Sequence, residues 1–320
     1  MLVQHESAPN PEKAANTNLI LTISSSIFFK EIGEGIVTEI GVWTSFYVDM
    51  EIEDAVRHLA EIGWFHIEYS FNHISRATEK CWKTRLKSLR ETCLSLNVKA
   101  WQLHSPLSLN LANFNQKERE KDLKTASRWL EYCQILDVPY MVIHPGGSQG
   151  YRSLKERNKI IELNIESFKR LGRVAEDLGV KLVIENMLAD SKCGGRRFLG
   201  EHIYEILEII EAVGSPSIGI CFDTSHANAL NLDIPEAIHE CGGLLWATHI
   251  SDNDGSGDQH RLPYNGNIDW ISVIKALKSI GYQNLLALEI PGETVKPIIV
   301  RDMKLKYAKE VLSWLLNQYS

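Results

Sequence analysis

An amphipathic helix that ends in glycine or another turn residue, followed by a short apolar run, recurs along most of the chain. Examples are AEIG–WFHIEYS, LSLN–VKAWQLH, EDLG–VKLVIEN and KSIGYQN–LLALEI. With a first run, IVTEIGVWT, the pattern predicts eight strands, at residues 36–43, 65–70, 98–103, 140–144, 181–185, 218–223, 245–250 and 285–289. Apolar runs this short suit strands buried on both faces, and their alternation with helices favours α/β architecture.

Eight strand–helix units fit a closed barrel better than an open sheet. The chain has no G-x-G-x-x-G motif after its first run, as an open dinucleotide-binding sheet would have. Its 320 residues exceed the roughly 250 that such a barrel typically needs. We therefore predict a (β/α)8 TIM barrel over residues 36–320. Residues 1–35 are expected to be an N-terminal extension that is partly disordered or caps the barrel.

Composition argues against several partners. The net charge of -7, from 34 basic and 41 acidic residues, disfavours binding to a phosphate-rich polymer. Six cysteines without a C-x-x-C pair suit a reducing compartment. The polar N-terminus does not resemble a signal peptide, and the apolar run Leu19–Phe29 is shorter than the roughly 20 residues of a membrane span. We expect a cytoplasmic protein with neither a nucleic-acid nor a membrane partner.

Ligand-type residues stand where six of the predicted strands end. They are His104, His144, Glu185, Asp223, His249 and Glu289. In a barrel these ends share one face, where active sites lie. One such residue alone would usually be structural, but six buried together are costly unless a cation neutralises the carboxylates and accepts the imidazole lone pairs. The pattern predicts a metal site.

Two local pairs add further candidate ligands to this face. Asp223 and His226 stand three residues apart in CFDTSHAN, and Asp258 and His260 stand two apart in GDQHR. The close spacing would let both members of a pair reach one ion. The alternative for each pair is turn formation by the aspartate beside a solvated histidine.

Several motifs together resemble the xylose isomerase-like barrels over residues 36–316. They are HSPLSLNL, VIHPGG, VIENM, CFDTSHAN, HISDNDGSGDQHRLPYNGNIDW and LEI. That family contains sugar-phosphate isomerases and epimerases as well as endonuclease IV. The resemblance implies a metal set of Glu185, Asp223, His249 and Glu289, usually holding Mn²⁺, Mg²⁺ or Co²⁺. It also implies that Glu185 and Glu289 transfer protons.

Endonuclease IV uses five more ligands to bind three zinc ions. Their counterparts here are His104, His144, His226, Asp258 and His260. The resemblance also allows these residues to bind the substrate instead, because many isomerase-like relatives use the same extra histidines against substrate hydroxyls. If those positions were occupied, the resemblance would imply zinc and phosphodiester hydrolysis. However, the long loop at residues 251–268 resembles the isomerase branch more closely, and no basic loops with interleaved aromatic residues follow the early strands.

These observations favour a metal-dependent sugar or sugar-phosphate isomerase or epimerase that transfers protons through an enediolate. The alternatives are an endonuclease IV-like zinc phosphodiesterase, or a lyase or hydrolase of the same family. The substrate is expected to be a small carbohydrate, and a homo-oligomer is left open. Trp43 is a candidate wall for the sugar ring or an ordinary core residue. Arg261 is a candidate ligand for a substrate phosphate or carboxylate, or a solvated surface residue.

Overall fold

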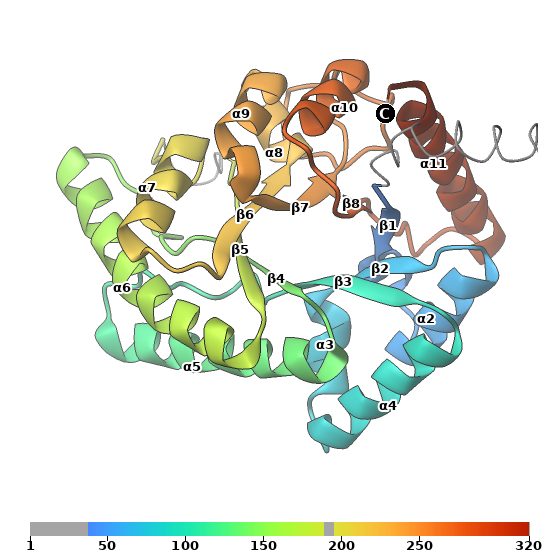
Figure 1. Ribbon diagram of the computed structural model, residues 1–320, viewed down its shortest axis with the longest axis horizontal. Coiled ribbons are helices and arrows are strands. Elements are labelled where there is room, and N and C mark those ends of the chain that lie inside the picture. The colour runs from blue at the N-terminus through green and yellow to red at the C-terminus, as the bar shows by residue number, and fades with distance from the viewer. Residues whose placement is uncertain (1–37, 189–194, 320) are drawn as a thin grey trace, which may run out of the picture. The chain divides into compact units, whose positions relative to one another are not determined.

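The computed structural model describes residues 38–188 and 195–319, and within them eight parallel strands close into one barrel. The strands follow one another around the barrel in chain order (Figure 1). They are β1 Ile40–Trp43, β2 His66–Tyr69, β3 Lys99–His104, β4 Tyr140–Ile143, β5 Lys181–Glu185, β6 Ile218–Asp223, β7 Leu245–Ile250 and β8 Leu286–Leu288. Closure is direct, because β1 pairs with β8 through Ile40 and Leu286.

Helices surround the barrel and connect successive strands (Figure 1). Their bounds are α2 Ile52–Glu61, α3 Phe71–Ala77, α4 Trp82–Ser95, α5 Gln116–Leu136, α6 Leu154–Leu178, α7 Ile203–Val213, α8 Thr224–Ala229, α9 Ile234–Cys241, α10 Trp270–Ser279 and α11 Ile298–Tyr319. Short 3-10 turns at Thr44–Tyr47 and Gly242–Leu244 complete the connections. No helix among the described residues is both long and apolar enough to cross a membrane.

Local sequence signals explain where α6 begins and where α5 and α6 end. The backbone N–H of Glu156 donates to Ser153 Oγ at 3.2 Å, which caps the start of α6. Gly179, with φ 68°, ends the same helix in the left-handed conformation that glycine adopts without steric cost. At the end of α5 an aspartate, Asp137, adopts this conformation instead, with φ 61°.

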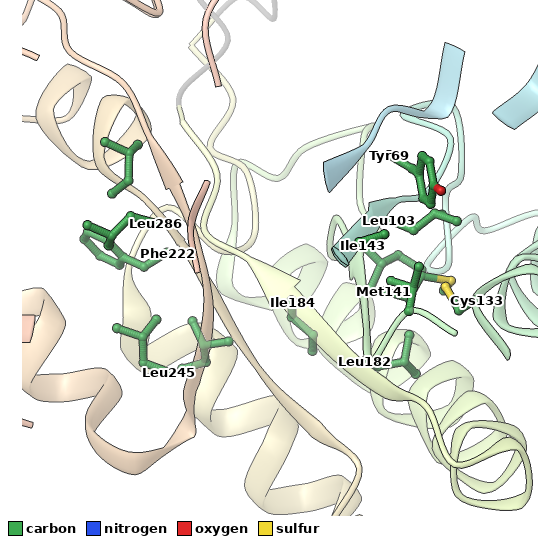
Figure 2. Packing of buried hydrophobic residues seen from close by; sticks show 14 of the residues in the cluster. Tyr69, Leu103, Cys133, Met141, Ile143, Leu182, Ile184, Phe222, Leu245 and Leu286 are labelled. Atoms are coloured by element: carbon green, nitrogen blue, oxygen red, sulfur yellow. The ribbon is translucent and has the colours of Figure 1, made fainter. Parts of the chain in front are cut away.

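The main hydrophobic core lies between the strands and the surrounding helices. Figure 2 shows Tyr69, Leu103 and Met141, from three neighbouring strands, gathered beside Cys133 of α5. All four side chains are fully buried. The described cysteines are free thiols, so this core is held by packing and not by disulfides.

The predicted barrel is confirmed, with small differences at strand boundaries. Every observed strand overlaps a predicted one, but β2, β4 and β8 each end before the last predicted residue. His144 and Glu289 therefore lie just beyond their strands. The predicted extension, residues 1–35, lies outside the described residues, as do the first two residues of the predicted first strand.

Candidate metal centre

Four ligand-type side chains converge at the carboxyl ends of the last four strands. Glu185 and Asp223 are the final residues of β5 and β6. His249 is the penultimate residue of β7, and Glu289 follows β8 directly. All four are buried, and each offers a ligand atom within 4.8 Å of the others. We call these four residues the strand-end cluster; the structure brings together the set expected to bind metal.

Two carboxylate oxygens in the strand-end cluster lack a hydrogen-bond donor. The backbone N–H of His226 donates to Asp223 Oδ1 at 2.8 Å, but Asp223 Oδ2 is buried without a partner. Glu289 Oε2 is likewise buried without a partner: His249 Nδ1 lies 3.1 Å away, without hydrogen-bond geometry. The same nitrogen lies 2.9 Å from Glu185 Oε1. Three carboxylates around one nitrogen would repel one another in a site that excludes water. This set of ligand atoms therefore fits an oxygen-preferring divalent cation.

The surroundings of the two glutamates shift their pKa values in opposite directions. Burial opposes ionisation of Glu185, but the nearby histidines, led by His249, outweigh it and hold its pKa well below the usual range. Burial raises the pKa of Glu289 to about 7, although His249 and His260 act to lower it. Near neutral pH Glu185 is therefore ionised, whereas Glu289 can hold a proton. A bound cation would favour the ionised form of both.

Three further histidines share one hydrogen-bond arrangement. In each, Nδ1 lies next to a backbone carbonyl oxygen: His104 beside Ser105 at 2.7 Å, His226 beside Asn186 at 2.7 Å, and His260 beside Glu289 at 3.0 Å. A carbonyl oxygen only accepts, so each Nδ1 carries the proton and donates it. In the neutral ring, Nε2 then offers a lone pair, which is the form that binds metals.

The Nε2 atoms of these rings face carboxylates. His104 Nε2 lies 3.1 Å from Glu185 Oε2. His226 and His260 direct Nε2 towards Asp258 Oδ2, at 3.7 and 2.9 Å. A lone pair beside a carboxylate is stable only with a proton or a cation between them. This geometry also fits metal ligands.

All five additional candidate ligands therefore surround the strand-end cluster. His144 completes them, with Nε2 3.2 Å from Glu185 Oε2. Two more groups with metal-ligand spacing result: one joins His104 to Glu185 and His249, and the other joins His226 and His260 to Asp223.

A cavity of about 470 Å³ opens above these residues. Its polar lining consists of His104, His144, Glu185, His226, Asp258, Gln259, His260 and Glu289. Its apolar lining consists of Trp43, Phe71, Leu107, Met187, Leu188 and Pro291. The Trp43 indole N–H donates to the Ile290 carbonyl oxygen at 2.8 Å, which fixes the ring as a wall of the cavity. The predicted position of Trp43 beside the site agrees with this geometry.

Arg261 does not share this position. Its guanidinium donates to Asp254 Oδ2 at 2.9 Å and to the Asn265 carbonyl at 3.2 Å, and its side chain is not among those that line the cavity. The expected contact of Arg261 with a substrate phosphate or carboxylate stays a prediction. Its backbone pairs with that of Asp252, and its side chain pairs with the loop residue Asp254.

Sequence reasoning missed residues that support the ligands from behind. Asn186 links β5 to β6: its Nδ2 donates to the Asp223 carbonyl at 3.0 Å, and the Asp223 N–H donates to its Oδ1 at 2.7 Å. Glu68 of β2 is fully buried against His249. The available signals were an amide directly after Glu185 and a charged residue within the apolar run WFHIEYS.

Comparison with known proteins agrees with the barrel fold. Residues 56–318 match the family described as xylose isomerase-like TIM barrel. The solved structure of a D-tagatose 3-epimerase-like protein superposes with a TM-score of 0.72 at 25% identity, covering 88% of this chain and 98% of that one.

Among relatives, an uncharacterized protein of Methanocaldococcus jannaschii is 31% identical over 190 residues, 58% of this chain and 63% of that protein. An inosose isomerase of Bacillus velezensis is 27% identical over 224 residues, 67% of this chain and 76% of the relative. A probable endonuclease 4 of Aquifex aeolicus is 26% identical over 161 residues, 50% of this chain and 51% of the relative. The alignments thus span between 51% and 76% of these three relatives.

Proposed function

Because this chain belongs to the xylose isomerase-like TIM barrel family, we propose that it is a divalent-metal-dependent isomerase or epimerase acting on a small carbohydrate. The observation that carries the proposal is the pair of buried oxygens without a donor, Asp223 Oδ2 and Glu289 Oε2, in a cluster of ligand-type residues. The epimerase-like solved structure and the inosose isomerase relative support the carbohydrate substrate.

A divalent cation in the strand-end cluster would supply the Lewis acidity that makes a C–H beside a sugar carbonyl acidic. The glutamates of the chain would then move the proton. Glu185 and Glu289 both line the cavity, so either can remove the proton from the substrate carbon. The other, or the same one, would return a proton to the opposite face of that carbon, which gives an epimer. For an isomer, the proton would return to the former carbonyl carbon while the adjacent hydroxyl proton passes to the former carbonyl oxygen, which leaves the substrate's composition unchanged.

The rest of the cavity suits a sugar. Trp43 and Phe71 offer apolar surfaces to the C–H groups of the substrate, and the polar side chains of the lining offer hydrogen-bonding atoms to its hydroxyls.

The test is solvent exchange with defined metal content. The protein would be stripped with a chelator, reloaded separately with Mn²⁺, Mg²⁺, Co²⁺ or Zn²⁺, and incubated in D2O with D-tagatose, other ketohexoses and inososes. NMR should show loss of a C–H signal beside the carbonyl only with reloaded protein. Exchange at equal rates in stripped and reloaded protein would rule out the metal-dependent mechanism.

A phosphodiesterase is the second candidate, favoured by the convergence of all nine endonuclease-type ligands and by the probable endonuclease 4 relative. Paired metal ions a few ångströms apart are typical of phosphodiester hydrolysis. Elemental analysis separates the candidates, because the isomerase proposal expects one ion per chain and the phosphodiesterase expects three.

We also predict that the protein does not bind duplex DNA containing an abasic site at physiological ionic strength. The physical reason is the net charge of -7, since affinity for DNA depends largely on neutralising phosphates. Fluorescence anisotropy with a labelled duplex, measured at low and physiological salt, is the appropriate assay. Tight binding followed by cleavage beside the abasic site would promote the phosphodiesterase over the isomerase.

A further inference from the structure

His104, His226 and His260 each turn one ring nitrogen to a backbone carbonyl oxygen, but His249 does not. Its Nε2 meets a side-chain carboxylate, with both oxygens of Glu68 at 3.1 Å. Both residues are fully buried. Their strands, β7 and β2, are not neighbours in the barrel, so the contact crosses the barrel interior. Its Nδ1 faces the carboxylates of the strand-end cluster and lies 2.9 Å from Glu185 Oε1.

The hydrogen-bond network around Glu68 shows that this carboxylate also accepts from Gln102. Gln102 Nε2 lies 3.0 Å from Glu68 Oε2 and 3.4 Å from the Thr248 carbonyl oxygen. The carbonyl oxygen only accepts, so the amide NH2 must occupy this position, and it therefore also donates to Glu68. Glu68 thus accepts from Gln102 and is available to accept from His249 as well.

We propose that Glu68 is a positioning residue for the metal ligand His249: it accepts the Nε2–H and so keeps the Nδ1 lone pair directed at the strand-end cluster. This role rests on the proposed metal centre. Glu68 does not line the cavity, so it acts through His249 and not on the substrate. A carboxylate behind a ligating imidazole fixes the tautomer and increases the basicity of the ligating nitrogen.

The competing explanation is that Glu68 only fills space in the barrel interior. Isothermal calorimetry with Mn²⁺ alone distinguishes the two. Glu68→Gln keeps the size of the side chain and an acceptor oxygen but removes the charge. Outer partners of metal ligands typically contribute on the order of 10- to 100-fold in affinity, and we expect Mn²⁺ binding to weaken by that factor.

Glu205→Gln is the matched control. Glu205 is also fully buried, and it accepts from Tyr151 Oη at 2.9 Å and from Arg157 Nε at 3.0 Å, away from the metal ligands. The Glu205→Gln variant should bind Mn²⁺ with an affinity within about threefold of wild type, since an outer residue affects metal affinity through its contact with a ligand. Wild-type affinity in folded Glu68→Gln would overturn the positioning role, as would an equal loss in the control.

A direct readout on wild-type protein does not depend on whether either variant folds. With Zn²⁺ bound, ¹⁵N NMR of the imidazoles should show His249 protonated at Nε2 and coordinated through Nδ1. The opposite tautomer would overturn the proposal. The metal centre and the role of Glu68 are tested separately. If the wild-type protein binds no cation, both are excluded. If the wild-type protein binds Mn²⁺ and Glu68→Gln binds it with the same affinity, only the role of Glu68 is excluded.

Discussion

Asp223 uses its two carboxylate oxygens differently. Oδ1 accepts from the His226 N–H and begins helix α8, while Oδ2 has no hydrogen-bond partner. The helix cap holds the carboxylate in one orientation, and this leaves the second oxygen directed at the cluster. One residue thus couples the local fold to the proposed ligand set.

This division predicts distinct effects for two substitutions. Asp223→Asn keeps an oxygen for the cap but replaces the ligand oxygen with an NH2 group, whereas Asp223→Ala removes both. We expect both variants to fold and to lose tight Mn²⁺ binding. In metal-free protein, Asp223→Ala should be less stable than Asp223→Asn by about 1 kcal/mol, the usual contribution of such a cap. Urea unfolding and metal analysis measure the two effects, and unchanged metal content in either variant would reject Asp223 as a ligand.

Glu289→Gln tests the proposed proton transfer at the residue scale. The amide oxygen can still face the cation, but an amide is no useful base near neutral pH. We expect metal to remain bound with reduced affinity and the rate to fall by roughly 100- to 10,000-fold, the typical contribution of a general acid–base group. The measurement is exchange of the substrate C–H with D2O, followed by NMR.

The control for this variant is Glu293→Gln, four residues along the same segment. Glu293 pairs with Lys296 at 3.3 Å and does not line the cavity. The Glu293→Gln variant should exchange the substrate C–H with D2O at the wild-type rate. Wild-type exchange in Glu289→Gln itself would transfer the base role to Glu185.

At the scale of elements, the loop of residues 251–268 depends on one buried carboxylate. Asp252 accepts from the Trp270 indole N–H at 2.9 Å and from the Asn253 N–H at 2.9 Å. These bonds join the end of β7 to the start of α10. The loop thereby holds Asp258 and His260 at the site, with His260 in the left-handed region at φ 45°. A backbone of this kind costs energy and persists only where its surroundings hold it.

Two glycines in this loop give a matched pair of tests. A Cβ at Gly266 would lie 2.1 Å from the Asn253 carbonyl oxygen, whereas a Cβ at Gly257 would meet nothing within 4 Å. Gly266→Ala should therefore displace the loop, lower the melting temperature and reduce activity. Gly257→Ala should leave the loop position, the melting temperature and the activity near wild type. Thermal unfolding measures the melting temperature, and substrate exchange measures the activity. Equal behaviour of the two variants would mean that the loop geometry does not control the site.

The elements show which features a sequence can predict. The strands could be located because each apolar run has a length and boundary of its own, and the ligands because they follow those runs. Contacts across the barrel could not be predicted. Glu68 and His249 are 181 residues apart on strands that do not pair, so no spacing relates them. The contacts of the Arg261 side chain with Asp254 and the Asn265 carbonyl depend on how the loop folds, which the loop composition does not reveal.

At the scale of the whole molecule, barrel closure explains why ligands distant in sequence meet. Parallel strands place every carboxyl end on one face, so His104 and Glu289, 185 positions apart in the chain, line the same cavity. The barrel interior below is apolar around Val142, Val183 and Ala247. The carboxylates and histidines of the site therefore lie on an apolar base, where carboxylates without a neutralising partner oppose folding.

This arrangement predicts that metal binding stabilises the entire fold. A cation that binds only the folded chain adds stability by mass action, about 2.7 kcal/mol when its free concentration is 100 times the dissociation constant. Calorimetric unfolding of chelator-stripped protein should therefore give a melting temperature that rises steadily with added Mn²⁺. Asp223→Asn, which keeps the helix cap but lacks the ligand oxygen, should show little rise over the same range. An equal rise in both proteins would place the stabilising cation elsewhere. No rise in wild type, at concentrations where calorimetric titration shows saturation, would mean that the cluster is neutralised by protons and not by a metal.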